Sequence, residues 1–426
     1  MIADLRVLSL VHGGEALARH EGRVVFLRGA VPGDLVQAEL SGEGRFEHVR
    51  ALRVLERSGS RVDAPCPIVE RCGGCPLQSV AAAAQASAKA ELAADALERV
   101  GGFARGSYQL ADLVASPLQF RYRRRARLHR AGPGSWGFAQ AGSARIEPVL
   151  ECLLFEPALQ ALADLVRAAG DLPGVTDVGL LSGERKGALD LRTEGTPTPG
   201  LRKRAEKLCD GRLVKGVVLG PKGAPELIGD PVIADAPLAN GARFRARPDT
   251  FAQANRQAVP LLQAEVLRAL EGAGNVLELF CGSGTLTLPL LGGGRAVTAV
   301  ESEGLSLALL RRSANEANLP VHLLAGDAAA IVRGLVGASD DALIARGFNG
   351  PIDAALLDPP RTGAAGVIKE LARLLPARIV YVSCDAPTLA RDGRALVDAG
   401  YRLVRAVPFD LFPQTAHFEV VATFSR

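Results

Sequence analysis

Apolar runs of strand length alternate with segments of helical periodicity from about residue 240 to the C-terminus. The run at residues 379–383 is β-branched and aromatic, and Cys384 follows it directly, just before a helical pattern that opens at Ala386 and Pro387. This alternation predicts an α/β fold with a doubly wound, Rossmann-like sheet. Ligands of such sheets bind at the carboxyl ends of the strands, so Cys384 would stand at a binding site. Taken alone, the position is more often that of a buried core cysteine.

The first 57 residues show a different pattern, in which apolar and polar positions alternate over short strands. Residues 23–27 and 35–40 are two such strands, and the turn-forming stretch from Gly29 to Asp34 separates them. Five strands at this spacing predict a small OB-like β-barrel, which is a common platform for nucleic acids. A barrel of this kind could equally serve as a packing module.

Residues 58–240 predict a central α+β domain, with an alanine-rich helix at 79–100 and a surface excursion at 184–215. The stretch 120–130 contains six arginines and no acidic residue. As a strand it would place Arg121, Arg123, Arg125 and Arg127 on one face, where they could follow a phosphate backbone. A solvated edge strand that its charges protect from aggregation is the alternative.

Length and composition narrow the choice of protein class. A chain of 426 residues suggests about three domains of ~150 residues each. Its hydrophobic content of 48% and charged content of 23% are those of an ordinary globular protein, and a net charge of +4 decides little. The first residues lack the apolar core of a signal peptide, and no apolar run reaches ~18 residues. We therefore expect a cytoplasmic protein that does not interact with membranes.

The seven cysteines are odd in number, and without an export signal they indicate thiols used for ligation or catalysis. Cys66, Cys72 and Cys75 lie within ten residues and have glycines between them, so their sulfurs can converge on one metal centre. Cys152 is the best candidate for a fourth ligand. Four thiolates suit either structural zinc or an iron–sulfur cluster, and the residues alone leave that choice open.

A glycine turn with the pattern Gly282-x-Gly284 follows the predicted strand at 275–279 and opens a helix, where a ligand could approach the backbone. Glu301 ends the second predicted strand, at the place where ribose hydroxyls would bind. Such a turn could also bind a dinucleotide. Glu278, before the glycines, and Asp327, after the third strand, favour S-adenosylmethionine instead.

Taken together, the motifs resemble the RNA uridine C5-methyltransferases that use a catalytic cysteine, in particular the iron–sulfur, TRAM-bearing branch that modifies ribosomal RNA. The resemblance covers nearly the whole chain, and the stretch 29–34 is similar to part of a TRAM domain. The motifs that carry it are Phe251-x-Gln253-x-Asn255, Leu279-Phe280-Cys281-Gly282-x-Gly284, Asp358-Pro359-Pro360-Arg361-x-Gly363, Ser383-Cys384-Asp385 and Phe412-Pro413-x-Thr415-x-His417-x-Glu419.

The resemblance implies two cofactors, S-adenosylmethionine and a [4Fe–4S] cluster, and two catalytic residues, Cys384 as nucleophile and Glu419 as base. The residues that it implies for S-adenosylmethionine are Gln253, Phe280, Gly282, Gly284, Thr285, Glu301, Asp327 and Asp358. Those that it implies for the cluster are Cys66, Cys72, Cys75 and Cys152. Two departures from the family pattern are the order Ala386-Pro387 after the nucleophile and Gln414 in place of histidine, which could influence substrate selection.

This chemistry explains why these residue types are needed. C5 of uracil is a poor nucleophile, but adding a thiolate to C6 turns C5 into an enolate carbon that can accept a methyl group. A carboxylate such as Glu419 must then remove the C5 proton. The target base must also leave its stack to reach Cys384, at a cost of a few kcal/mol that the arginine face could offset.

The expected organisation is a TRAM barrel at 1–57, a central cluster domain at 58–240 and a methyltransferase domain at 241–426, in a monomer whose partner is 23S ribosomal RNA. Transfer RNA is the alternative substrate. An amino- or glutamine-directed methyltransferase is disfavoured by Arg361 and Cys384, because such enzymes usually have an aromatic residue after the prolines and need no nucleophilic cysteine. An inactive RNA-binding factor is disfavoured by the intact motifs.

Overall fold

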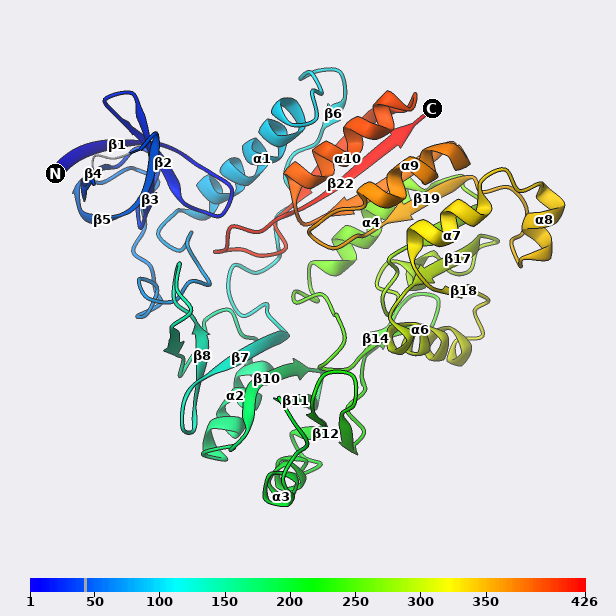
Figure 1. Cartoon of the computed structure of the whole chain (residues 1–426), viewed down its shortest axis with the longest axis horizontal. Coiled ribbons are helices and arrows are strands. Elements are labelled where there is room, and N and C mark those ends of the chain that lie inside the picture. The colour runs from blue at the N-terminus through cyan, green and yellow to red at the C-terminus, as the bar shows by residue number, and fades with distance from the viewer. Residues whose placement is uncertain (42–43) are drawn as a thin grey trace.

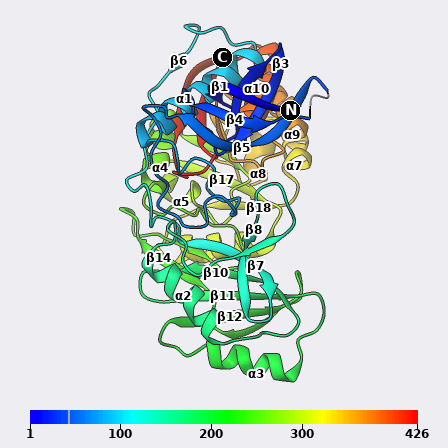
Figure 2. The ribbon, with the colours of Figure 1, turned by 90° about the vertical axis from the view of Figure 1, so that its left-hand side faces the viewer.

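The structure is a computed structural model that describes residues 1–41 and 44–426. It divides into a small barrel at the N-terminus, a central sheet, and a large C-terminal sheet with helices on both faces (Figure 1). The central sheet and the C-terminal sheet occupy opposite ends of the molecule, with the barrel beside the C-terminal sheet (Figure 2). Within the described residues, no helix is long and apolar enough to cross a membrane.

The N-terminal barrel confirms the predicted OB-like architecture. Its strands close in the order β1-β2-β3-β5-β4, and buried apolar residues alternate with more exposed ones. Asp34, fully buried, accepts hydrogen bonds from the backbone N–H groups of Val31 and Ser58 and pairs with Arg61, so it ties the barrel to the segment that follows. The strands are β1 (Ile2–Leu10), β2 (Ala16–His20), β3 (Arg23–Arg28), β4 (Leu35–Glu39) and β5 (Phe46–Glu56).

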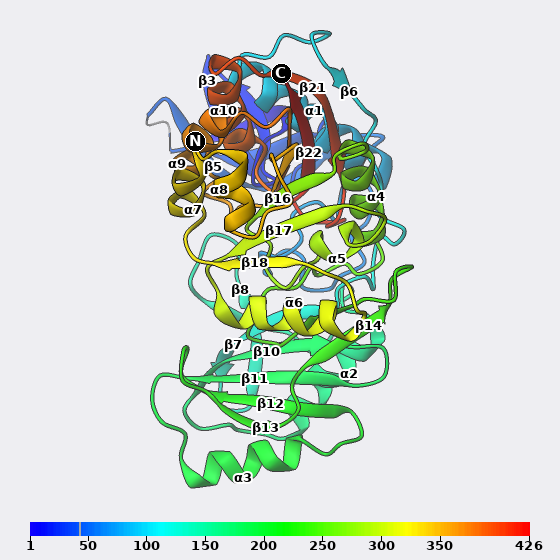
Figure 3. The ribbon, with the colours of Figure 1, turned by 90° about the vertical axis from the view of Figure 1, so that its right-hand side faces the viewer.

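The central sheet has the strand order β13-β12-β11-β10-β7-β8-β9, and α2 and α3 share one hydrophobic core with it. Figure 3 shows α3 at the far end of the molecule. The elements are β7 (Arg125–Gly132), β8 (Ser135–Ala139), β9 (Ile146–Pro148), α2 (Pro157–Ala168), β10 (Val175–Ser182), β11 (Gly187–Thr193), α3 (Pro199–Leu208), β12 (Val214–Gly220) and β13 (Glu226–Gly229).

The prediction of a surface excursion at 184–215 is wrong. This range contains β11, which lies in the middle of the central sheet, paired with β10 on one side and β12 on the other. Its alternating run from Gly187 to Thr193 is almost entirely buried, and Asp190 is neutralised there by Arg127 and Arg192. The charged run Arg202-Lys203-Arg204 lies in the helix α3, which begins at Pro199.

The C-terminal sheet confirms the doubly wound prediction. Its strand order is β18-β17-β16-β19-β20-β22-β21-β6; β16 to β20 run parallel, and β22 is antiparallel to both of its neighbours. The strands are β16 (Asn275–Leu279), β17 (Ala296–Glu301), β18 (His322–Ala325), β19 (Ala354–Leu357), β20 (Arg378–Ser383), β21 (Arg402–Phe409), β22 (Glu419–Ser425) and β6 (Gln109–Leu110), and a separate ribbon is formed by β14 (Ile233–Pro237) and β15 (Arg243–Ala246).

Two hydrophobic cores fill the two faces of this sheet. One contains residues of α4 and α6, and the other contains residues of α7, α9, α10 and α1. The helix α1 therefore packs on the C-terminal sheet although it precedes the central sheet in the chain. The helices are α1 (Ala82–Arg99), α4 (Val259–Ala269), α5 (Thr287–Leu290), α6 (Gly304–Glu316), α7 (Ala328–Leu335), α8 (Asp340–Ala345), α9 (Ala365–Leu374) and α10 (Ala386–Asp398).

Candidate active site

The turn after β16 brings backbone N–H groups to the carboxyl end of the sheet. Phe280, Gly282 and Gly284 have left-handed backbones, with φ of +63°, +53° and +91°. A Cβ atom on Gly284 would stand 2.5 Å from Cδ1 of Leu310, so only glycine allows this packing of the turn against α6. The Gly282 N–H donates to the Glu301 carboxylate over 3.0 Å, which joins the turn to the end of β17.

Two carboxylates lie at the ends of neighbouring strands beside this turn. Glu301 also accepts hydrogen bonds from the backbone N–H groups of Ser302 and Glu303, at 2.7 and 2.8 Å. Asp327 follows β18 and caps α7 by accepting from the Ala330 N–H at 2.9 Å. Because β17 and β18 are parallel and paired, both predicted cofactor residues occupy the same edge of the sheet.

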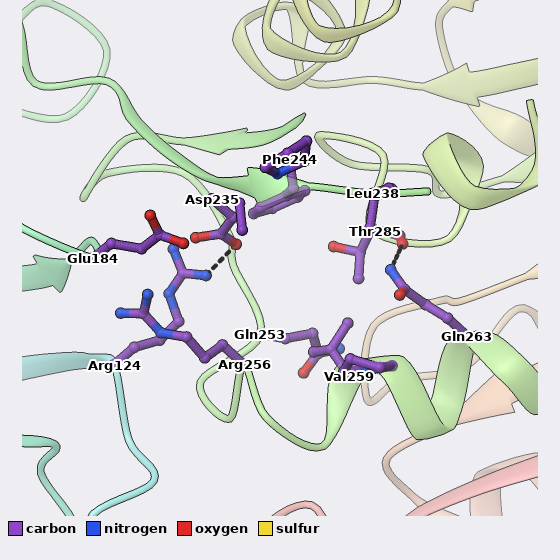
Figure 4. Close-up of a pocket in the computed structure, with 13 residues that line it drawn as sticks. Arg124, Glu184, Asp235, Leu238, Phe244, Gln253, Arg256, Val259, Gln263 and Thr285 are labelled. Atoms are coloured by element: carbon purple, nitrogen blue, oxygen red, sulfur yellow. Dashed lines mark hydrogen bonds and ion pairs between the residues drawn. The ribbon is translucent and has the colours of Figure 1, made fainter. Parts of the chain in front are cut away.

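Gln253 and Thr285 line a cavity of about 280 Å³ between the central and C-terminal regions (Figure 4). Gln263 donates to the Thr285 carbonyl over 2.7 Å and holds that residue beside the cavity. Arginine and acidic side chains gather at the opposite end. The other six residues predicted for the cofactor do not line this cavity, so the eight fall into two groups. The six are Phe280, Gly282, Gly284, Glu301, Asp327 and Asp358.

Cys384 occupies the short connection between β20 and α10. Asp385 caps α10 by accepting from the Thr388 N–H at 2.9 Å, and the Ser383 hydroxyl accepts from the Asp385 N–H at 3.1 Å. The thiol is half-buried, so it is accessible to a reactant. Burial and the nearby Glu419 carboxyl raise the pKa of Cys384 to about 11, while the charge and a hydrogen bond of Arg361 act in the opposite direction.

Three carboxyl groups at strand ends lie close to this thiol or to one another. Glu419 begins β22 and is 4% exposed; burial and then the charge of Asp358 raise its pKa well above the usual value, and Arg361 opposes the shift. Burial raises the pKa of Asp358 to about 7. Burial also raises the pKa of Glu278, one strand further along, to about 8. Desolvation has therefore made these groups stronger bases than ordinary carboxylates.

His417 and Arg361 form the exposed side of this cluster, with an Arg361 nitrogen 3.2 Å from Nε2 of His417. Burial and the charge of Arg361 lower the pKa of His417 to about 4, so the imidazole is neutral at pH 7. Gln414, the departure from the family pattern that could influence substrate selection, has its side chain inside the protein. It is 5% exposed and bonds to Gln85 and Gln119.

The four predicted cluster cysteines line one small cavity together with Ile68, Val69, Phe138 and neighbouring apolar side chains. Gly73 lets the cysteine segment lie close to the chain at residues 139–141, because a Cβ atom there would stand 3.1 Å from the Ala139 oxygen and the Ala141 nitrogen. Gln78 and Glu151 also line the cavity, and the four thiols are the donors that an iron–sulfur cluster takes. In the described part of the chain, no group of three or more histidine, cysteine or acidic side chains has the arrangement of a site for a metal ion.

The predicted row of unpaired arginines is wrong in two respects. The strand β7 begins only at Arg125, and Arg121, with φ of +55°, lies in an irregular segment before it. Acidic residues outside the stretch also pair with four of its six arginines, two of which belong to the predicted row, and the local sequence did not reveal this. Those pairs are Arg121 with Glu151, Arg124 with Asp235, Arg127 with Asp190, and Arg130 with Asp171.

Two residues that bear on the site were missed in the sequence, Gln85 and Lys89 of α1. Each is 1% exposed, and both contact the loop between β21 and β22 that leads to Glu419. The sequence contains a signal for these two residues. A glutamine and a lysine one helical turn apart lie on the same helix face as the alanines of the core. Long polar side chains on such a face need buried partners.

The doubly wound fold and the carboxylates at its strand ends are those of the S-adenosylmethionine-dependent methyltransferases. A structure of the Pyrococcus abyssi tRNA (uracil-54, C5)-methyltransferase, in complex with S-adenosyl-L-homocysteine, superposes with a TM-score of 0.74 over 99% of both chains. The two sequences are 21% identical, so this likeness establishes the fold.

Sequence comparison gives the family. Residues 238–426 match the family model described as tRNA (Uracil-5-)-methyltransferase. A 23S rRNA (uracil(1939)-C(5))-methyltransferase of Dechloromonas aromatica is 32% identical over 98% of both chains, and one of Pseudomonas putida is 34% identical over 99% of this chain and 93% of its own. An uncharacterized RNA methyltransferase of Gloeobacter violaceus is 33% identical over 99% and 95%. The chain belongs to the RNA uracil-C5-methyltransferase family, as its motifs indicated, and is an enzyme of that family.

Proposed function

We propose that this enzyme transfers a methyl group from S-adenosylmethionine to C5 of a uridine in 23S ribosomal RNA. The observation that supports this most directly is the similarity to 23S rRNA methyltransferases over almost the full length of both chains, barrel and cysteine segment included. The family model names tRNA in its description, but it spans only residues 238–426 and so includes neither the barrel nor the cysteine segment. Transfer RNA is the second candidate, and the solved tRNA enzyme supports it through the fold only.

The residues proposed to hold the cofactor are those that the motifs indicated. Glu301 and Asp327 would bind the adenosine end at the ends of β17 and β18, and Gln253 and Thr285 would bind the amino-acid end from their cavity. Phe280, Gly282 and Gly284 would let the cofactor approach the backbone of the turn, and Asp358 would lie near the methyl group. When bound, S-adenosylmethionine supplies an electrophilic methyl carbon on a sulfonium.

Cys384 is the proposed nucleophile. Its thiolate adds to C6 of the uracil, and the C5=C6 electron pair moves towards the C4 carbonyl to give an enolate. C5 then forms a bond to the methyl carbon, while the carbon–sulfonium bond breaks and its electrons remain on the departing sulfur. Arg361 lowers the pKa of Cys384 against the effect of burial, and so favours the thiolate that starts the reaction.

Glu419 is the proposed base for the second half of the reaction. It takes the proton from C5, the C5–H electrons re-form the C5=C6 bond, and the C6–S bond breaks to return the Cys384 thiolate. Its burial and its proximity to Asp358 raise its pKa, which strengthens it as a base for a weakly acidic carbon.

One assay tests the activity and one tests the substrate. Purified enzyme should move labelled methyl groups from S-adenosylmethionine to 23S rRNA transcripts, and tRNA transcripts serve as the control. Mapping of 5-methyluridine in RNA from cells with and without the gene should then show a single site lost from 23S rRNA. Loss of a tRNA site instead would contradict the ribosomal assignment, and no loss in either RNA would contradict the activity.

We also propose that Cys66, Cys72, Cys75 and Cys152 hold a [4Fe–4S] cluster. Their sulfurs line one cavity, and a cluster separates its four ligands further than a single ion does, because each iron takes one thiolate. Protein purified without oxygen should be brown and contain iron and sulfide. A colourless protein with stoichiometric zinc would contradict this proposal.

A further inference from the structure

The loop between β21 and β22, residues 410–418, leads directly to Glu419; we call it the base loop. It contains no helix or strand, yet most of its side chains are buried. Its internal hydrogen bonds are few and involve mainly Thr415, whose N–H and hydroxyl both donate to the Phe412 carbonyl. Such a loop cannot hold its own shape, so groups outside it must set its position.

The helix α1 provides two such groups one helical turn apart. Gln85 and Gln414 form a reciprocal pair: the Gln414 N–H donates to Oε1 of Gln85 at 2.9 Å, and Nε2 of Gln85 donates to Oε1 of Gln414 at 3.0 Å. Lys89 donates through Nζ to the Asp410 carboxylate at 2.7 Å and to the Phe412 carbonyl at 3.1 Å. These four side chains are all at most 5% exposed.

The backbone of Gln414 would not adopt its conformation without outside bonds. Its φ is +70°, in the left-handed region that residues other than glycine rarely occupy. The Leu77 N–H, two residues beyond Cys75, donates to the Gln414 carbonyl at 3.1 Å. Bonds from α1 and from the cysteine segment therefore hold one strained residue from two sides.

Stability alone does not explain these polar groups. Replacing a buried ion pair by apolar residues is often neutral or stabilising, so apolar side chains at these positions could serve a purely structural contact equally well. Neither Gln85 nor Lys89 is exposed enough to touch RNA or cofactor. Their effect on the reaction must pass through the base loop.

We propose that Gln85 and Lys89 are positioning residues, and that the Gln85–Gln414 pair places Glu419 against the C5 proton. This inference rests on the proposed function, because it takes Glu419 as the base. Cys384 sits between β20 and α10 and is held by bonds within its own connection. Attack and methyl transfer should therefore survive loss of the pair, while proton removal and release of the RNA should slow.

The test compares Gln85→Ala and Gln414→Gly with Gln37→Ala, a control glutamine in the barrel whose side chain donates to the Asp4 carboxylate. Glycine at position 414 accepts the positive φ without strain, so this variant should fold even though its side-chain bonds are gone. Each full-length protein is given a 23S rRNA fragment and labelled S-adenosylmethionine. The readouts are the single-turnover methylation rate, kcat, KM for RNA, and labelled protein–RNA adduct that survives denaturation.

We expect kcat to fall by roughly ten- to a hundredfold in both test variants, because each loses buried hydrogen bonds that hold the base loop. Gln414→Gly loses two side-chain bonds, and Gln85→Ala loses both bonds to Gln414 as well as those to the Leu77 and Val80 carbonyls. KM and the single-turnover methylation rate should stay within about threefold of wild type, because binding and the first half of the reaction are untouched. Methylated adduct should accumulate in both, and not in Gln37→Ala.

Wild-type turnover in the folded variants would overturn the inference. So would an equal loss of methylation and turnover without adduct, because the pair would then act before proton removal. Failure of both variants to fold would make the pair a structural contact only. Glu419→Gln, measured in parallel, distinguishes failure of this inference from failure of the proposed function. If Glu419→Gln forms no adduct, the proposed role of Glu419 fails whatever the Gln85 variant does.

Discussion

The two proposed reacting groups reach the same site by different structural means. Cys384 stands at the junction of a regular strand and a regular helix, and the hydrogen bonds that shape its connection join residues at most three positions apart. Glu419 follows an irregular loop, and the bonds that hold this loop come from distant parts of the chain; those from Lys89 and Gln85 span 321 to 329 positions. One group is positioned locally and the other by the tertiary structure.

This difference separates the two halves of the proposed reaction. A strand in the middle of a sheet is held by its neighbours along its whole length, so the thiol at its end has few ways to move. A loop that depends on a few buried bonds can shift when one of them is lost. Substitutions far from the site should therefore affect proton removal more than nucleophilic attack, and the following predictions test that contrast.

The largest effect is expected for Cys384→Ala. Alanine offers no nucleophile, so methyl transfer should fall by at least about 10⁴-fold. Thermal unfolding should change little, because the thiol is only half-buried. Methylation of 23S rRNA transcripts measures the loss, and Cys209→Ala, whose thiol lies in the central region, is the matched control. A residual rate within about tenfold of wild type would exclude Cys384 as nucleophile.

Glu419→Gln should lower turnover by about 10²- to 10⁴-fold, the usual contribution of a general base. Glutamine keeps the shape of the side chain and loses its basicity, so attack and methylation should still occur. The product should be protein joined covalently to methylated RNA, visible as a labelled band under denaturing conditions. Turnover at the wild-type rate would mean that another group is the base, and Asp358 would be examined next.

Lys89→Met should lower the free energy of unfolding by about 3–5 kcal/mol, because it leaves the Asp410 carboxylate buried without its partner. The double variant Lys89→Met/Asp410→Leu should recover most of that loss in denaturant titrations. Recovered stability without recovered turnover would show that the ion pair serves the base loop and not the fold. Recovery of both stability and turnover would contradict the contrast between the local positioning of Cys384 and the tertiary positioning of Glu419.

The rates of methylation and of turnover should both rise from pH 6 to pH 9. Cys384, with a pKa of about 11, must lose its proton before attack, so the single-turnover rate should increase about tenfold per pH unit below that value. Glu419, whose pKa is also raised, must be deprotonated to act as a base, so it changes turnover in the same direction. Arg361→Ala should raise the pKa of Cys384 further and slow attack at pH 7. A flat profile would contradict both assignments.

The smallest effect is expected at the arginines before and within β7. Arg123→Ala with Arg125→Ala should lower the log–log salt slope of RNA binding by about one to two, since within residues 1–41 and 44–426 neither arginine pairs with a carboxylate, unlike four of their neighbours. Arg204→Ala, on the exposed face of α3 at the far end of the molecule, should leave the slope unchanged (Figure 3). An unchanged salt slope in the double variant would mean that this face of the protein contacts solvent and not RNA.

Much of the fold could be predicted because its patterns are local. The barrel follows from short alternating strands, and the doubly wound sheet follows from apolar strands that alternate with helices. The predictions for the arginine stretch and for residues 184–215 were wrong for one reason: the partners of these residues are distant in the chain. Asp190 neutralises Arg127 across β10, and β11 is buried because β10 and β12 flank it, which no local window of sequence contains.

For the site, the sequence by itself determined which groups stand at strand ends, because the local apolar pattern shows where each strand stops. These groups are Cys384 after β20, Glu301 at the end of β17 and Asp358 after β19. Only the tertiary structure decided how these groups behave. The order of the strands brings Glu419 next to Cys384, and burial then raises the pKa of both. The position of the base loop was likewise decided by α1, since a loop without regular hydrogen bonds takes its shape from the partners that surround it.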